Sequence, residues 1–160
     1  MCAKIAAVGC DVMVGFPGES AREFDATARF LEAHPLAYAH VFTYSERPGT
    51  PAPRLHQLVP PPEKRRRSVA LRELAAAIRT RYARSQRGTR QEVLLEAPAG
   101  EGYWQGLTGN YLRVRIPWRA AGTPEPGRTL RTVLLTEIGN DGVMDGLPDG
   151  DAETERGWRA

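Results

Sequence analysis

Two short stretches place glycine, proline and charged side chains just after an apolar run. The first follows residues 12–14 and consists of Gly15, Phe16, Pro17, Gly18 and Glu19. Glycine has no Cβ and lets a ligand approach the backbone, while proline fixes the direction of a turn. Glu19 has the charge to hold a polar ligand group or to interact with the positive N-terminus of the following helix. The pattern predicts a small-molecule site, with close packing of a strand on a helix as the alternative that the residues alone favour.

The second stretch ends another apolar run and contains Tyr44 and Arg47. A guanidinium binds carboxylate or phosphate groups through two parallel hydrogen bonds, and a tyrosine ring can line the mouth of the same site. We therefore expect both side chains to contribute to the predicted site. The alternative is a surface arginine beside a packed tyrosine.

Positive charge is concentrated in one segment. Residues 1–61 carry five basic and six acidic groups, residues 62–90 carry ten and two, and residues 91–160 carry seven and eleven. A concentrated positive field attracts polyanions. The candidate phosphate contacts are Arg65, Arg66, Arg72 and Arg79, although a solvated helix face explains a run of charges as well.

Aromatic and basic side chains alternate further along the chain, where base stacking and contacts to a nucleic-acid backbone would need both. The aromatic members are Tyr103, Trp104 and Trp118, and the candidate RNA-binding residues are Asn110, Tyr111, Arg113 and Arg115. The alternative is that some of the aromatic rings fill a core and that Asn110 and Tyr111 form a turn.

Cys2 and Cys10 are the only cysteines, and neither belongs to a C-x-x-C pair. We expect them to be structural, and the residues predict neither a metal ligand nor a catalytic side chain. No apolar stretch approaches the roughly 20 residues of a transmembrane helix, and no secretory signal precedes residue 9. These features predict a cytoplasmic protein without a membrane partner.

The elements that must position these residues change character along the chain. A strand at 12–14, a helix that begins at the capping box of Ser20 and Glu23, and a strand at 38–44 predict a βαβ unit. A proline-rich passage and a helix over 63–85 follow. Five short strands, at 91–96, 103–107, 112–116, 129–137 and 142–145, then predict a small barrel or sandwich.

The expected fold class is therefore α/β plus all-β, in four parts. They are a βαβ part at 1–61, a basic connecting helix at 62–87, a β-barrel at 88–147 and a flexible acidic tail at 148–160. We interpret the apolar run 12–14 as a strand buried on both faces of a parallel sheet. Two parallel strands and one helix leave open edges and uncovered faces, so we expect a missing N-terminal part or a partner to complete the first part.

The motifs resemble one family of enzymes. DVMVGFPGES at 11–20 and HVFTYSERPGTPA at 40–52 resemble the end of the catalytic barrel in radical SAM tRNA methylthiotransferases, and the second motif favours the MtaB type. VLLE at 93–96 and GLTGNYLRV at 106–114 resemble the TRAM domain of the same enzymes, a small β-barrel implicated in holding tRNA. The resemblance covers residues 9–147. Gly109 stands where the family usually has Glu, and Ser20 where it usually has Thr.

This resemblance implies the C-terminal part of a radical SAM partial TIM barrel, followed by a TRAM β-barrel. The implied reaction adds a methylthio group to threonylcarbamoyl-adenosine next to the anticodon of tRNA, with S-adenosylmethionine and 4Fe-4S clusters as cofactors. The family's C-x-x-x-C-x-x-C motif has no counterpart here, so we expect this chain to be inactive alone. The alternative function is a stand-alone RNA-binding module, made of the TRAM barrel and the arginine-rich helix, without catalysis.

Overall fold

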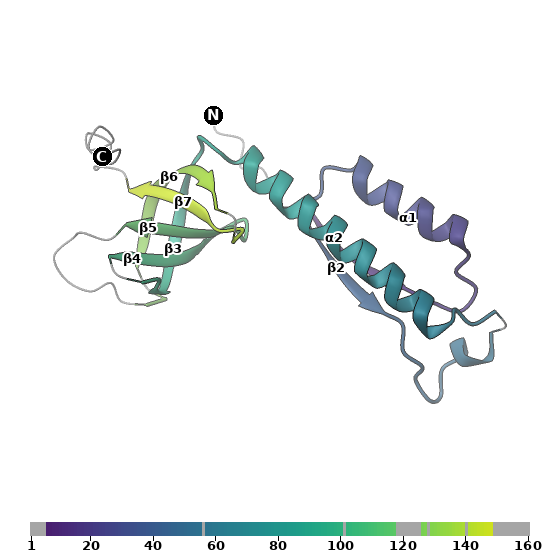
Figure 1. Ribbon diagram of the computed structural model, residues 1–160. Coiled ribbons are helices and arrows are strands. Elements are labelled where there is room, and N and C mark those ends of the chain that lie inside the picture. The colour runs from purple at the N-terminus through teal and green to yellow at the C-terminus, as the bar shows by residue number, and fades with distance from the viewer. Residues whose placement is uncertain are drawn as a thin grey trace. The chain divides into compact units, whose positions relative to one another are not determined.

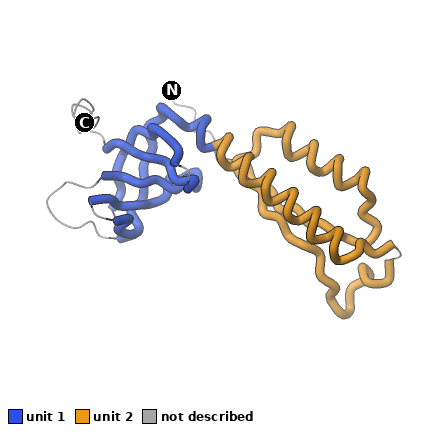
Figure 2. Tube along the Cα trace, in the orientation of Figure 1, with its two compact units in different colours: residues 1–6, 83–160 blue, residues 7–82 orange. Residues whose placement is uncertain are grey.

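The computed structural model describes residues 6–55, 57–100, 102–117, 126–127, 129–139 and 141–148. It separates into two compact units, shown in Figure 2. Residues 7–82 form the front unit, and the described residues from 83 onward form the back unit. The predicted boundaries at 61 and 87 differ from this division because most of the long helix packs within the front unit. Cys2, Trp118 and residues 149–160 of the predicted tail lie outside the described residues.

The front unit begins with the predicted strand, helix and strand. They are β1 (Gly9–Val14), α1 (Ala21–Ala33) and β2 (Tyr38–Thr43), and the two strands pair in parallel with Val12 opposite Val41 (Figure 1). Helix α1 starts where the sequence predicts, because the backbone N–H of Glu23 donates to the Ser20 hydroxyl (3.2 Å) and the Glu23 carboxylate accepts from the backbone N–H of Ser20 (2.7 Å). A short 3-10 helix, η1 (Ala52–Arg54), interrupts the proline-rich passage.

Helix α2 (Pro61–Ser85) completes the core of the front unit. The buried cluster joins β1, both helices and the segment before β2, and its members are Val14, Phe24, Leu31, Leu36, Leu71 and Ile78. Pro61 suits the first turn of the helix because backbone N–H groups there have no partner within the helix. The packing stripe predicted for this helix is confirmed at Leu71, Ile78 and Tyr82, which are all buried.

One face of the two-stranded sheet remains open in the described structure. Val14 is fully buried, but its neighbour Met13 is 53% exposed and Phe42 on β2 is 52% exposed. The interpretation of 12–14 as a strand buried on both faces is therefore wrong for these residues. The apolar side chains on the open face are what an incompletely covered parallel sheet presents.

The back unit is a closed five-stranded barrel. Its strands are β3 (Arg90–Pro98), β4 (Tyr103–Thr108), β5 (Arg113–Pro117), β6 (Leu130–Ile138) and β7 (Met144–Pro148), in the order β3-β4-β5-β7-β6. Strands β5 and β7 pair in parallel, and the other neighbours are antiparallel. The strand pattern in the sequence was compatible with either a barrel or a sandwich, and the structure shows a barrel.

Alternate residues of the barrel strands point into its core. Val93, Leu95, Val114, Ile116, Val133 and Leu135 are fully buried, with Met144 beside them. Gly106 on β4 lies so close to β3 that a Cβ there would overlap the carbonyl oxygen of Leu94. Closure of this small barrel therefore depends on a residue without a side chain at that point.

Candidate functional site

The turn after β1 depends on two glycines with positive φ. Gly15 has φ +75° and Gly18 has φ +91°, values that side chains of L-residues rarely permit. A Cβ on Gly15 would also lie 2.5 Å from Cγ of Lys64, whereas a Cβ on Gly18 would meet no atom within 4 Å. Close packing against Lys64 thus explains why residue 15 is glycine. Gly18 instead leaves its backbone open to approach. Pro17 between them is buried.

Glu19 is held within the protein. Its carboxylate accepts a hydrogen bond from the backbone N–H of Gly15 (2.6 Å) and another from Nη1 of Arg67 (2.8 Å). The side chains of Glu19 and Arg67 are only 12% and 6% exposed. The carboxylate that we considered for a ligand therefore ties the turn to α2.

Arg67 was missed as a structural residue. It belongs to the basic segment 62–90, but it is buried, and its guanidinium lies 5.4 Å from the ring of Phe24. Burial lowers the pKa of Arg67, but hydrogen bonds with Glu63 and Glu19 outweigh burial and raise it. The helical spacing could have predicted this burial, because Arg67 lies four residues before Leu71 and therefore on the apolar stripe.

Glu63 neutralises a second arginine at the start of α2. Its carboxylate accepts from Nε and Nη2 of Arg66 (both 2.8 Å) and from Nε of Arg67 (2.8 Å). These hydrogen bonds lower the pKa of Glu63 to about 2. Arg66 is exposed, yet its charge is already paired, which makes it a weaker candidate for a phosphate than its neighbours.

An aromatic group lies beside the β1 turn. The rings of Phe16 and Tyr44 meet edge to face at 5.2 Å, and Nζ of Lys64 lies 5.0 Å from the centre of the Tyr44 ring. The Tyr44 hydroxyl is buried and has no hydrogen-bond partner among the described residues. A buried hydroxyl without a partner is costly, so this group fits a site whose ligand would supply the partner.

Arg47 lies three residues beyond Tyr44 and is exposed. Its carbonyl accepts from the backbone N–H (3.3 Å) and the hydroxyl (2.8 Å) of Thr50, which closes a turn. Its guanidinium forms no ion pair with a described residue. The structure brings the 15–19 turn and Tyr44 together, whereas the Arg47 side chain forms no hydrogen bond or ion pair with these described residues.

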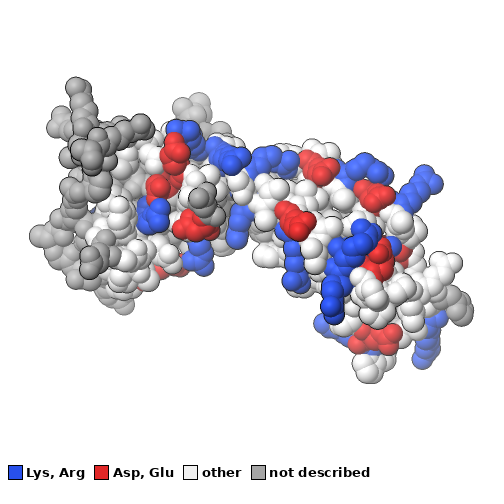
Figure 3. All heavy atoms as spheres, in the orientation of Figure 1, with Lys and Arg blue, Asp and Glu red and all other residues white. Residues whose placement is uncertain are grey.

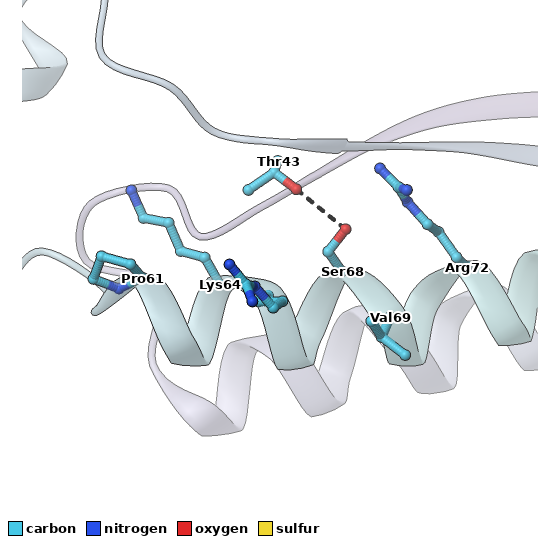
Figure 4. Close-up of a pocket in the computed structure, with 7 residues that line it drawn as sticks. Thr43, Pro61, Lys64, Ser68, Val69 and Arg72 are labelled. Carbon is cyan, nitrogen blue, oxygen red and sulfur yellow. Dashed lines mark hydrogen bonds between the residues drawn. The ribbon is translucent and has the colours of Figure 1, made fainter.

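A hollow of about 360 Å³ lies at the carboxyl end of β2, against the first turns of α2 (Figure 4). Its lining residues are Thr43, Pro61, Lys64, Arg65, Ser68, Val69 and Arg72. The Thr43 hydroxyl donates to the Ser68 hydroxyl at 3.1 Å. The lining contains three cations and no carboxylate, and none of these cations forms an ion pair within the described part of the chain.

The remaining basic residues of α2 differ in what they contact. Arg81 donates to the carbonyls of Glu32 (3.0 Å) and His34 (2.9 Å) and thereby satisfies the end of α1. Arg79 is exposed and forms no ion pair with a described residue. Figure 3 shows that Lys and Arg are interspersed with Asp and Glu on the visible face of both units. Arg65, Arg72 and Arg79 therefore carry the unpaired charge among the predicted contacts of this helix.

The turn between β4 and β5 presents Tyr111 to solvent. Tyr111 has φ +64° and is 68% exposed. The Asn110 side chain accepts from the Thr108 hydroxyl and donates to Oε1 of Gln86 at 3.4 Å, and Gln86 is 2% exposed. This buried network fixes the turn, and the ring stands free for stacking. Sequence reasoning missed Gln86, which follows directly after the helix and carries no motif.

The two predicted arginines of β5 have different surroundings. Arg113 is exposed, whereas Nε and Nη2 of Arg115 donate to the Asp145 carboxylate on β7 at 3.0 Å and 2.9 Å. These hydrogen bonds raise the pKa of Arg115. Arg115 therefore links two neighbouring strands of the barrel, and the sequence separation of 30 residues concealed this partner.

The described residues do not fit an iron–sulfur cluster. No group of three His, Cys, Asp or Glu side chains within them is placed to hold a metal ion. Cys10 is half-buried and packs against the core, and burial together with the charge of Asp11 raises the pKa of its thiol. None of the described helices is long and apolar enough to cross a membrane.

Comparison with known proteins identifies related enzymes. No family model matches the chain. The chain is 32% identical over 130 residues to the threonylcarbamoyladenosine tRNA methylthiotransferase MtaB of Aquifex aeolicus and 34% identical over 134 residues to that of Thermotoga maritima. The matches include 81% and 84% of this chain. The chain spans only 30% of the length of either curated relative.

A second group of relatives bears another name. The tRNA-2-methylthio-N(6)-dimethylallyladenosine synthase of Neisseria meningitidis is 44% identical over 86 residues, which are 54% of this chain and 20% of the relative. The synthase of Actinobacillus pleuropneumoniae is 35% identical over 131 residues, or 82% of this chain and 27% of the relative. The two named groups therefore match at comparable levels.

Proposed function

The chain is a homologue of radical SAM tRNA methylthiotransferases, and from this premise we propose that it forms one wall of the cofactor site and the tRNA-binding part of such an enzyme. The observation that carries the proposal is the similarity to the two MtaB relatives over more than four fifths of the chain. The closed barrel, where the sequence resembles a TRAM domain, supports it. The proposed substrate is adenosine beside the anticodon, with threonylcarbamoyl-adenosine favoured by the motif at 40–52.

The proposed cofactor wall consists of the β1 turn and the mouth of β2. The backbone at Gly18 and the unpartnered Tyr44 hydroxyl would hold S-adenosylmethionine, with Phe16 against its apolar part and Arg47 at the rim. When bound, this cofactor supplies the radical in this class of enzymes. Gly15 and Glu19 act indirectly, because their hydrogen bond and the Arg67 ion pair keep the turn in place.

The proposed tRNA surface has a part in each unit. On α2 the phosphate contacts are Arg65, Arg72 and Arg79, whose charges have no described partner. On the barrel, Tyr111 stacks on an unpaired base, Arg113 follows the backbone, and Asn110 holds the turn in place. Arg66 and Arg115 contribute less because carboxylates already hold them.

We also propose what covers the open face of the front unit. Met13 and Phe42 expose apolar surface on β1 and β2, and the relatives are more than three times as long as the matched segment. A polypeptide equivalent to the unmatched part of the relatives would add strands beside this sheet and bury that face. The radical SAM partial barrel would then be complete only in this combined form.

Binding of tRNA tests the proposal directly. We expect an unmodified tRNA transcript to bind the full chain with an affinity that falls as salt rises, because cations on the protein displace counterions from phosphates. Fluorescence anisotropy across a salt series measures this, with a double variant Arg65→Gln and Arg79→Gln expected to flatten the slope. An affinity independent of salt would refute RNA binding.

A second experiment addresses the reaction. We expect no methylthio product from this chain alone after anaerobic treatment with iron, sulfide and S-adenosylmethionine, since two cysteines cannot supply a four-iron cluster with its ligands. The second candidate function is an RNA-binding module without catalysis, and the observation that favours it is the exposed Tyr111 and Arg113 on the closed barrel. Product formation after addition of the cysteine-bearing part of a relative would support the enzyme, and tRNA binding without any product would support the module.

A further inference from the structure

We infer that the hollow beside β2 binds one phosphodiester of the RNA backbone, through a pair of hydroxyls that neither the motifs nor the relatives assign. This inference rests on the proposed function and adds Thr43 and Ser68 to its RNA-binding residues. The hollow holds about 360 Å³ and lies at the carboxyl end of β2. Ligands of open α/β sheets bind at that end of the strands.

Charge selects an anion as the occupant. Lys64, Arg65 and Arg72 line the hollow, and no carboxylate lines it with them. The neighbouring Arg66 and Arg67 face away to Glu63 and Glu19. In the first turns of α2, the cations held by carboxylates therefore lie apart from those without a carboxylate partner. All of the latter surround the hollow.

The hydroxyl pair gives the hollow a directional donor. Lys64, Ser68 and Arg72 recur every fourth residue and therefore share one face of α2. Figure 4 shows Lys64 and Arg72 on either side of Ser68, which points toward Thr43. The Thr43 and Ser68 hydroxyl oxygens lie 3.1 Å apart, and whichever of them donates to the other, one hydroxyl hydrogen of the pair remains to donate to an anion.

The shape favours a polymer over a small enclosed ligand. Arg65, Val69 and Arg72 at the rim are exposed, while Ser68 at the floor is buried. An anion that reaches Ser68 therefore remains open to solvent along the rim, as a phosphate within a continuous chain requires. The two non-bridging oxygens of a phosphodiester can accept hydrogen bonds from the remaining hydroxyl hydrogen at the floor and from the guanidinium N–H groups at the rim.

The test compares the loss of hydroxyls with the loss of charge. In the full chain, the double variant Thr43→Val and Ser68→Ala should bind a tRNA transcript about tenfold more weakly, because hydrogen bonds to a charged group are lost. Its salt slope should stay as in the wild type, whereas Arg72→Gln should reduce the slope by about one. The control Arg22→Gln removes the same charge from α1 and should change neither quantity.

The outcomes separate this inference from the proposed function. If the wild type binds tRNA in a salt-dependent way and the hydroxyl double variant binds it with unchanged affinity, the phosphodiester site is wrong while the proposed function stands. No salt-dependent tRNA binding by the wild type would overturn both. A titration with inorganic phosphate, followed through the NMR chemical shift of the Ser68 amide, shows whether the hollow binds free phosphate. If it binds free phosphate while the variants bind tRNA with wild-type affinity, the inference is also overturned. Circular dichroism verifies folding, and if the double variant unfolds, the single variant Ser68→Ala decides the matter, because Arg72 is already a phosphate contact of the proposed function.

Discussion

Arg67 shows how one buried charge can hold a turn and a helix together. Its guanidinium donates to the Glu19 carbonyl oxygen and carboxylate and to the Glu63 carboxylate, all at 2.8 Å. A buried ion pair contributes little relative to an apolar pair, but removal of one partner leaves an uncompensated charge. The consequence falls on Glu19, whose carboxylate then lies in a largely buried place without a compensating charge.

We expect Arg67→Met to destabilise the front unit by about 3 kcal/mol for this reason. Urea unfolding followed by circular dichroism at 222 nm, which reports α1 and α2, measures the change. The matched control is Arg66→Met, whose side chain is 60% exposed, and it should cost under about 1 kcal/mol. Equal losses in the two variants would contradict the buried role of Arg67.

Glu63 makes the stability of the front unit depend on pH. Its pKa in the folded chain falls from the ordinary value of 4.5 to about 2 because Arg66 and Arg67 donate hydrogen bonds to it. A lowered pKa means that the ionised group stabilises the fold fully above pH 4.5, and that this contribution disappears as the pH falls from 4.5 to about 2. We expect the stability difference between wild type and Glu63→Gln to shrink over that range. Urea unfolding at several pH values tests this, and a constant difference would refute it.

At the scale of single elements, the β1 turn requires glycine twice for different reasons. Both positions have positive φ, but only at Gly15 would a Cβ overlap the Lys64 side chain. We expect Gly15→Ala to cost about 2 kcal/mol and Gly18→Ala about 1 kcal/mol, since the second variant adds backbone strain alone. Thermal or urea unfolding compares them. A larger loss at Gly18 would mean that the turn is held by contacts other than those described.

Local patterns predicted the elements well where one signal dominated. The capping box placed the start of α1, and the strand expected at 91–96 is found within β3. The helix stripe predicted the packing of α2 but not the burial of Arg67, because a polar residue on an apolar face has no visible partner until the chain folds. The Arg115–Asp145 and Gln86–Asn110 contacts were hidden for the same reason. The outward side chain of Met13 depends on which segments cover the sheet, and sequence periodicity over three residues cannot decide that.

At the scale of the whole molecule, the two units differ in how completely their strands are paired. In the barrel, β3 pairs on both sides, with β4 and β6, whereas β1 pairs only with β2 among the described residues. We expect backbone amides of β1 and β2 to exchange with deuterium at least about tenfold faster than those of β3. Hydrogen exchange with mass spectrometry measures this difference. Equal protection would indicate that the open sheet is covered in solution, for example by a second copy of the chain.

The missing side chain at position 106 has a consequence for how this gene can change over time. Every single-base missense change in a glycine codon adds at least a methyl group, and any such group would collide with the neighbouring backbone at Leu94. Selection against misfolded barrels should then remove nearly all missense variation at this codon, whatever RNA the protein encounters. In surveys of genomes, an invariant glycine here would mark genes whose barrels close in the same way, even after their loops have diverged.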